Sequence, residues 1–246
     1  MEEMKQNLSP MKVVPEKYVM KEFWLSAAEE WLSYLKDNIA SPMQLGILQA
    51  YYRAWADEID MDAAYNFWKM SEDIITVYSL NMGVERNSPF VPVEIKEAFS
   101  KSTCFLGYYN MAGLGVTSNN GNALSWFMKS LNVPNREAYN ALYQIYREGI
   151  GVQIDCCKAF SYLRTCCELG LGKGVDYFNM ALCLQDGWGV DENIDAAFKC
   201  MEMAAGMNHP GALEYLISSS LNSTDISGGL DKVVEYINQY SSLISE

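Results

Sequence analysis

Two glycines and two cysteines stand close together in the stretch YREGIGVQIDCCKAF, residues 146–160. Gly149 and Gly151 are separated by one residue, and a glycine pair of this kind can cradle a phosphate group with backbone N–H groups. Cys156 and Cys157 follow shortly afterwards, and a thiolate could act as a nucleophile or bind a metal. The stretch therefore raises three possibilities: a nucleotide site, a thiol site, or a bend in the chain.

A second glycine-rich segment, LGLGKGVDYF at residues 169–178, matches neither of two well-defined phosphate-binding patterns. A dinucleotide fingerprint needs G-x-G-x-x-G after a strand, and a P-loop needs Gly-Lys followed by Ser or Thr. Here Lys173 is followed by Gly174, and the preceding residues have a helical pattern. We interpret this segment as a long turn between repeating units.

Residues that bind metals or act as nucleophiles are few and widely spaced. The chain has seven cysteines without a C-x-x-C pair, and its one histidine is His209. Zinc sites need several such residues at tight spacing. The sequence shows no Ser or Cys arranged to form a catalytic triad with His209. This histidine precedes Pro210 at a predicted helix start, so we expect it to be an ordinary loop residue. The sequence thus predicts no catalytic residue, no metal and no cofactor.

The composition is that of an acidic chain with enough apolar residues for a sizeable core. Half of the 246 residues are hydrophobic and the net charge is −13. No apolar run reaches about 18 residues, so no membrane span is expected. The charged N-terminal region lacks an apolar secretory segment, which predicts a cytoplasmic protein. The acidity disfavours nucleic acid and membrane surfaces. It suits a basic protein partner, or it simply keeps the protein soluble.

The Gly-x-Gly-Val sequence of the opening stretch occurs three times. Its first glycines are Gly113, Gly149 and Gly187, which are 36 and 38 residues apart. A recurring spacing of this length is the signature of a helical repeat array. The repetition therefore favours a structural role for the glycines over a nucleotide site.

Each repeat has the pattern of a helix, a tight turn and a second helix. The first glycine can end a helix in the left-handed conformation, the second keeps the turn tight, and the Val packs beneath it. The Asn or Asp three residues after the Val is expected to cap the next helix, and the Ala seven residues after it lets the two helices approach closely. The expected caps are Asn119, Asp155 and Asn193, and the alanines are Ala123, Ala159 and Ala197.

This pattern resembles the Sel-one-like repeat, a relative of the tetratricopeptide repeat built from paired antiparallel helices. The resemblance implies an all-α fold, an α/α superhelical solenoid of antiparallel helix pairs. Cys166 and Cys167 occupy the slot in which the next unit has Ala204 and Ala205, so they are expected to be small packing residues rather than nucleophiles. The best-matching unit contains Leu142, Tyr146, Gly149, Gly151, Val152, Asp155, Lys158 and Ala159.

The resemblance divides the chain into four segments. Residues 1–41 form an N-terminal capping helix region, with an amphipathic helix expected at 22–39. Residues 42–94 form a degenerate first repeat and a loop, and residues 95–208 form three Sel-one-like repeats. Residues 209–246 supply the C-terminal capping helices.

Arrays of this kind mostly grip partner proteins on their concave face. The resemblance therefore implies a non-catalytic protein-binding module, an adaptor or a scaffold. A narrower alternative is an immunity or inhibitor protein that neutralises a basic toxin or effector, because charge complementarity speeds such an association. A third hypothesis is a hydrolase, which a deep polar pocket around Cys104 or Asp186 would favour.

In tetratricopeptide-like units the first helix of each pair lines the concave face. On each of these helices, three residues are expected to point toward that face. Their mixture of aromatic residues, Met, amides and one Arg is typical of contact surfaces. Truncation of Tyr108 or Arg147 is expected to weaken partner binding and to leave thermal stability nearly unchanged. Phe178 and Leu182 have an alternative role, packing under the C-terminal helices. This predicted contact set consists of Cys104, Tyr108, Met111, Asn140, Gln144, Arg147, Phe178, Leu182 and Gln185.

Overall fold

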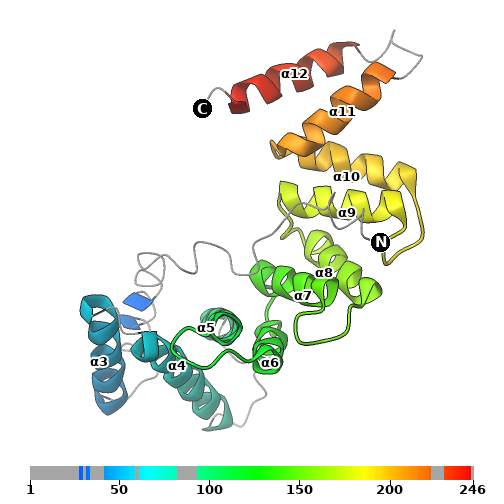
Figure 1. The fold of residues 1–246 in the computed structure, drawn as a ribbon. Coiled ribbons are helices and arrows are strands. Elements are labelled where there is room, and N and C mark those ends of the chain that lie inside the picture. The colour runs from blue at the N-terminus through cyan, green and yellow to red at the C-terminus, as the bar shows by residue number, and fades with distance from the viewer. Residues whose placement is uncertain are drawn as a thin grey trace. The chain divides into compact units, whose positions relative to one another are not determined.

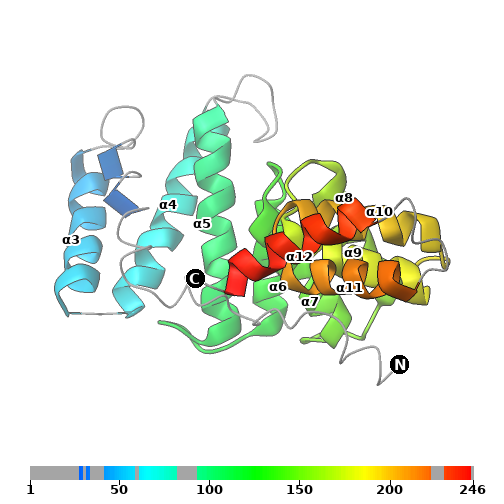
Figure 2. The same ribbon diagram turned by 90° about the horizontal axis from the view of Figure 1, so that it is seen from above.

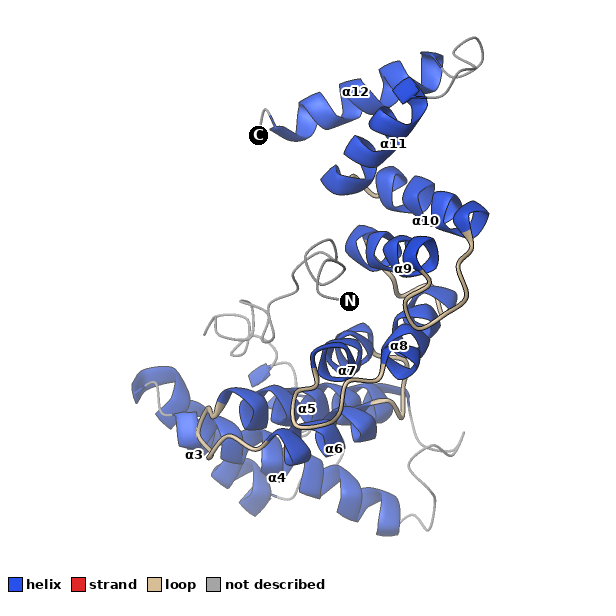
Figure 3. Cartoon of the chain, turned by 45° about the vertical axis from the view of Figure 1, so that its right-hand side comes forward, coloured by secondary structure: helices blue, strands red, loops and turns tan. Residues whose placement is uncertain are grey.

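The computed structural model describes residues 28–29, 32–33, 42–58, 61–81, 93–222 and 230–244. This part of the chain is helical and contains no strand, which confirms the predicted all-α class (Figure 3). None of its helices combines the length and the hydropathy needed to cross a membrane. The helices are α3 (Pro42–Glu58), α4 (Met61–Asn81), α5 (Val93–Ala112), α6 (Asn120–Ser130), α7 (Arg136–Glu148), α8 (Cys156–Glu168), α9 (Gly174–Asp186), α10 (Ile194–Gly206), α11 (Pro210–Asn222) and α12 (Leu230–Ile244).

The chain divides between Gln153 and Ile154 into two compact units, the first containing α3–α7 and the second α8–α12 (Figure 1). In the first unit α4 packs against α3 and α5, and α6 packs against α5 and α7. In the second unit α9 packs against α8 and α10, and α11 packs against α10 and α12. Each helix thus packs mainly on its neighbours in the sequence, as expected for helix pairs in a repeat array.

Of the predicted N-terminal helix at 22–39, the structure describes residues 28–29 and 32–33, which are helical. The hydroxyl of Tyr52 in α3 donates a hydrogen bond to the carboxylate of Glu29. The rest of that predicted helix lies outside the described residues.

Aromatic side chains join α3, α4 and α5, the segment where the repeat pattern is weakest. The rings of Trp55 and Phe67 have centroids 6.4 Å apart, and Trp68 packs edge-on against Phe105 at 4.6 Å. Each of these four side chains is buried. Large aromatic surfaces therefore hold together helices that lack the Gly-x-Gly-Val turn. Of the loop expected in this segment, residues 82–92 lie outside the described residues.

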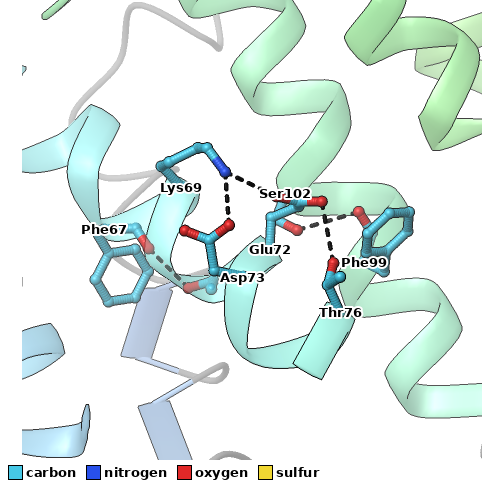
Figure 4. Close-up of polar contacts among 8 residues, drawn as sticks. Phe67, Lys69, Glu72, Asp73, Thr76, Phe99 and Ser102 are labelled. Atoms are coloured by element: carbon cyan, nitrogen blue, oxygen red, sulfur yellow. Dashed lines mark hydrogen bonds and ion pairs between the residues drawn. The ribbon is translucent and has the colours of Figure 1, made fainter. Parts of the chain in front are cut away.

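A polar cluster on α4 satisfies a buried carboxylate (Figure 4). Lys69 Nζ lies 3.0 Å from Glu72 and 2.7 Å from Asp73, and the Thr76 hydroxyl donates to Glu72 at 3.2 Å. Burial alone would lower the pKa of Lys69, but its hydrogen bonds to Asp73 and Glu72 raise that pKa above the ordinary value. Figure 2 shows α4 and α5, which pack side by side, from above.

The turns of the repeats have the capping chemistry that the sequence predicts. Gly149 and Gly187 end α7 and α9 in the left-handed conformation, with φ of 72° and 66°. Asn119, Asp155 and Asn193 each accept a hydrogen bond of 2.9 Å from the backbone N–H three residues later. These groups satisfy backbone atoms that a helix end leaves without a partner.

The small residues expected at the helix contacts are buried, whereas the valines are not fully enclosed. Cys166 and Cys167 are buried like Ala204 and Ala205, which supports their interpretation as packing residues. The valines of the three Gly-x-Gly-Val turns are half-buried, so these turns lie closer to the surface than expected. The alanines Ala123, Ala159 and Ala197 are all buried.

The second glycine of the turn is needed for a reason beyond the tightness of the turn. Gly151 and Gly189 have φ of 70° and 73°. A Cβ on Gly151 would overlap with the Cβ of Asn120, and one on Gly189 would overlap with the carbonyl oxygen of Cys156. Asn120 and Cys156 are the first residues of α6 and α8. The second glycine therefore packs directly on the second helix of the preceding repeat.

His209 lies in the turn directly before α11, as expected, and its side chain also caps that helix. Its Nδ1 accepts a hydrogen bond of 3.3 Å from the backbone N–H of Ala212, which requires a neutral imidazole with its proton on Nε2. The ring stacks on Phe178 with centroids 4.4 Å apart. Burial lowers the pKa of His209 below the ordinary value.

Because Gly189 lies so close to Cys156, an added methyl group there should lower the free energy of unfolding by more than backbone strain alone would. Gly170 is a matched control, because its φ is 71° and an added Cβ there would meet no atom within 4 Å. We expect Gly170→Ala to lower the free energy of unfolding by about 1 kcal/mol. Gly189→Ala should lower it by on the order of 3 kcal/mol. Urea unfolding followed by circular dichroism measures both, and equal losses would contradict the packing role.

The neutral cap at His209 predicts a loss of stability in mild acid. A folded-state pKa below the unfolded value of about 6.5 means that the contribution is complete above that pH. It is lost as the pH falls from about 6.5 through the folded-state pKa. His209→Asn keeps a capping acceptor that does not titrate. We expect thermal melts of this variant to lose less stability than wild type between pH 7.5 and pH 5.5. If wild type and His209→Asn lost the same amount of stability over this pH range, titration of the His209 cap would not be the cause.

Candidate protein-interaction surface

The predicted contact set falls on α5, α7 and α9, each the first helix of one Gly-x-Gly-Val unit. Each helix carries three of its members at spacings of four and three residues. Residues so spaced lie on one side of an α-helix. The sequence therefore places each triplet along one helix stripe, and the structure shows how far each stripe is exposed.

The α5 triplet, Cys104, Tyr108 and Met111, is buried. The Tyr108 ring packs edge-on against Phe127 with centroids 4.9 Å apart, and its hydroxyl donates to the carbonyl oxygen of Glu137 at 3.2 Å. Burial, followed by the nearby Cys104, raises the pKa of Tyr108 well above its ordinary value. Tyr108 thus packs among α5, α6 and α7, and this differs from the expectation that it faces an open groove.

The α7 triplet is polar and buried, with Asn140 4%, Gln144 3% and Arg147 5% exposed. Within the described residues, the enclosed Oδ1 of Asn140 has no hydrogen-bond partner, and neither have Nε and Nη1 of Arg147. The Arg147 guanidinium lies 5.8 Å from the centre of the Tyr143 ring, one turn earlier on the same helix. This stripe therefore combines burial with unused hydrogen-bonding groups.

The α9 triplet is the most open of the three. Phe178 is half-buried, stacks on His209, and lies close to Gly211 in α11, which agrees with its alternative role of packing under the C-terminal helices. Leu182 is buried. Gln185 is half-buried, and its enclosed Oε1 has no hydrogen-bond partner in the described part of the chain.

A surface feature outside the predicted set is found on α6. The half-buried indole of Trp126 lies beneath two ammonium groups, with Lys129 Nζ 4.3 Å and Lys69 Nζ 5.5 Å from the ring centre. The three-residue spacing of Trp126 and Lys129 could have indicated their pairing on a helix. The contribution of Lys69 from α4 has no such local signal, because the two helices are brought together only by packing.

The two residues named for a hydrolase have opposite surroundings. Cys104 lies inside the first unit and is 1% exposed, while Asp186 is exposed at the last position of α9. Within the described residues, no three or more His, Cys, Asp or Glu residues gather in a way that could hold a metal ion.

The family comparison matches the Sel1 repeat at residues 100–131, 137–171 and 176–209. These matches contain, in order, the end of α5 with α6, α7 with α8, and α9 with α10. The resemblance inferred from the Gly-x-Gly-Val pattern is confirmed. Residues 100–209 of this chain therefore contain three Sel1 repeats.

Solved structures show the same fold at low sequence identity. A Sel1 repeat protein from Oxalobacter formigenes is 21% identical with a TM-score of 0.53, and the match covers 82% of this chain and 85% of that one. A protective antigen of uropathogenic Escherichia coli with an SLR fold is 15% identical with a TM-score of 0.53. That match covers 98% of this chain but 56% of the antigen, so this chain spans a little over half of it. A comparison with curated proteins found no match.

The packing of Tyr108 predicts a stability loss where the groove interpretation predicts none. Tyr108→Phe keeps the ring but removes the hydrogen bond to Glu137, which should cost about 1 kcal/mol. Tyr108→Ala also empties the space beside Phe127 and should cost about 3 kcal/mol or more. Chemical unfolding of the two variants gives both values. An alanine variant as stable as wild type would place Tyr108 in an open groove after all.

Proposed function

We propose that this chain is a non-catalytic protein-binding module, an adaptor or scaffold, whose partner contacts Asn140, Arg147 and Gln185 of the predicted contact set. Sel1 repeat proteins generally mediate protein–protein interactions and are typically non-catalytic. The proposal adds to this the location of the contact and its chemical character.

The observation that carries the proposal is the position of unused hydrogen-bonding groups. In the described part of the chain, Asn140, Arg147 and Gln185 all have enclosed side-chain atoms without a hydrogen-bond partner, and all belong to the contact set. Leaving such a group unpaired costs about 1–3 kcal/mol, and native proteins contain few of them. A partner that supplies the missing hydrogen bonds would recover this cost, which supports binding at these residues.

A second candidate function is an immunity or inhibitor protein that neutralises a basic toxin or effector. The net charge of −13 favours it, since a strongly acidic surface accelerates encounter with a basic partner. This function requires that the captured partner be basic and that its activity be suppressed on binding. An adaptor would instead leave the activity of its partner unchanged.

The half-buried Gln185 provides the test, because its side chain can be shortened with little loss of packing. Gln185→Ala should weaken partner binding by about 1 kcal/mol, a factor of roughly five. Asp186→Ala is the matched control, since Asp186 is the adjacent exposed residue and lies outside the contact set. The tagged protein and both variants would be used to capture partners from the native host, with quantification by mass spectrometry and a melting curve for each variant.

Loss of one specific partner in Gln185→Ala, with that partner retained by Asp186→Ala, is the expected result. A partner that both variants hold as firmly as wild type would show that the contact set is not the binding surface. If no protein is enriched over an unrelated tagged control, the binding-module proposal itself fails.

A further inference from the structure

Arg147 is a buried cation without a counter-charge among the described residues. It is 5% exposed, and its Nε and Nη1 atoms are enclosed without hydrogen-bond partners. A guanidinium stays protonated in proteins, so it cannot relieve its burial by losing the charge. Burying an unpaired charge costs several kcal/mol, and the arrangement therefore needs an explanation.

Two neighbouring features offset only part of this cost. Arg147 lies in the last turn of α7, where the helix dipole favours a positive charge by about 0.3–1 kcal/mol. The Tyr143 ring, 5.8 Å from the guanidinium, contributes an attraction of comparable size. Neither feature provides hydrogen-bond acceptors for Nε and Nη1. The Nε–H and Nη1–H groups of Arg147 can therefore donate hydrogen bonds to a ligand that has two acceptor oxygens.

We infer that Arg147 is the docking point for a carboxylate side chain in an extended acidic segment of the partner protein. This inference rests on the proposed binding function and specifies the chemistry of its partner. The planar guanidinium fork matches the two oxygens of a carboxylate, and such bidentate pairs are stronger and more directional than neutral hydrogen bonds. Reaching the enclosed Nε and Nη1 atoms requires the side chain to turn toward the incoming carboxylate.

Asn140 supplies the second contact. It lies seven residues before Arg147 on the same side of α7, a rise of about 10.5 Å at roughly 1.5 Å per residue. An extended chain covers that distance in about three residues, at roughly 3.3 Å each. The unpaired Oδ1 of Asn140 can then accept a backbone N–H of the segment whose carboxylate binds Arg147. The segment recognised therefore has an acidic residue about three positions from that N–H group.

The net charge and the contact site make opposite predictions about the partner. With a net charge of −13, long-range attraction favours a basic segment. At physiological salt, exposed charges are screened beyond about 8 Å, so the groups in direct contact decide which segment binds. At Arg147 that group is a cation, which repels lysine and attracts glutamate.

The test uses three fluorescein-labelled peptides of twelve residues, built from repeated Gly-Ser-Glu, Gly-Ser-Gln or Gly-Ser-Lys. Fluorescence anisotropy at 0.15 M salt measures their binding to the full chain. We expect the glutamate peptide to bind at least tenfold more tightly than the glutamine peptide, and Arg147→Met to remove that difference. Arg164→Met is the control, since Arg164 is 53% exposed and paired with Glu168 at 3.6 Å. It removes the same charge and should leave the peptide preference unchanged.

A melting curve separates this role from a structural one. Arg147→Met replaces an unpaired buried cation with an apolar side chain of similar length, so the variant should melt at a higher temperature than wild type. Loss of glutamate binding together with a raised melting temperature supports the inference. A lower melting temperature would show that Arg147 is already paired in the free protein and would overturn it.

Three further outcomes overturn the inference. Equal binding of the glutamate and glutamine peptides by wild type is the first, and tighter binding of the lysine peptide is the second. The third is a native partner captured equally by wild type and Arg147→Met, which leaves the binding module in place and removes only the acidic docking point. Failure to capture any native partner counts against the binding module, while the peptide titration still decides the chemistry of Arg147.

Discussion

The close approach at Gly151 and Gly189, the second glycines of two Gly-x-Gly-Val turns, is the contact on which the stacking of the repeats depends. At Gly189 the backbone lies against the carbonyl oxygen of Cys156, and at Gly151 it lies against the side chain of Asn120. Asn120 and Cys156 hold equivalent positions, directly after the N-caps of α6 and α8. One turn therefore ends its own first helix and also contacts the second helix of the repeat before it. A single side-chain carbon on this glycine would push neighbouring repeats apart.

The same turn determines which residues can surround it. Since Cys156 follows the cap Asp155, its backbone faces the glycine of the next unit, while Cys157 is exposed. The backbone N–H of Lys158, followed by its ammonium group, donates to Asp155 and lowers the pKa of that carboxyl. The glycines and cysteines that suggested a phosphate or thiol site are thus the parts of a helix cap and a packing contact.

Polar groups inside this protein fall into two kinds. Glu72 is buried but hydrogen-bonded to Lys69 and Thr76, so its charge is compensated within the fold. Asn140 and Arg147 are buried to a similar extent, yet atoms of both lack partners among the described residues. An unpaired buried charge lowers stability. Arg147 is therefore expected to have a role other than stabilising the fold, in contrast to Glu72. The binding of a partner that we propose would make use of this difference.

The features determined by the sequence alone are those that depend on a few consecutive residues. The caps at Asn119, Asp155 and Asn193 and the left-handed glycines Gly149 and Gly187 follow from hydrogen bonds and sterics within one helical turn. The 36- and 38-residue spacings likewise identified the repeat and its antiparallel helix pairs. The helix stripe that carries each candidate contact residue also follows from periodicity, so the location of the candidate site could be predicted to that level.

Exposure and pairing were decided only by the tertiary structure. Tyr108 is buried because Phe127 and Glu137, 19 and 29 residues later in the chain, pack against it. Periodicity places a side chain on one side of a helix but does not state what covers that side. Whether the amide of Asn140 and the guanidinium of Arg147 find partners likewise depends on atoms distant in the sequence. Local rules thus determined the helices and turns of this protein, whereas packing between distant segments decided which buried groups of the described residues lack hydrogen-bond partners.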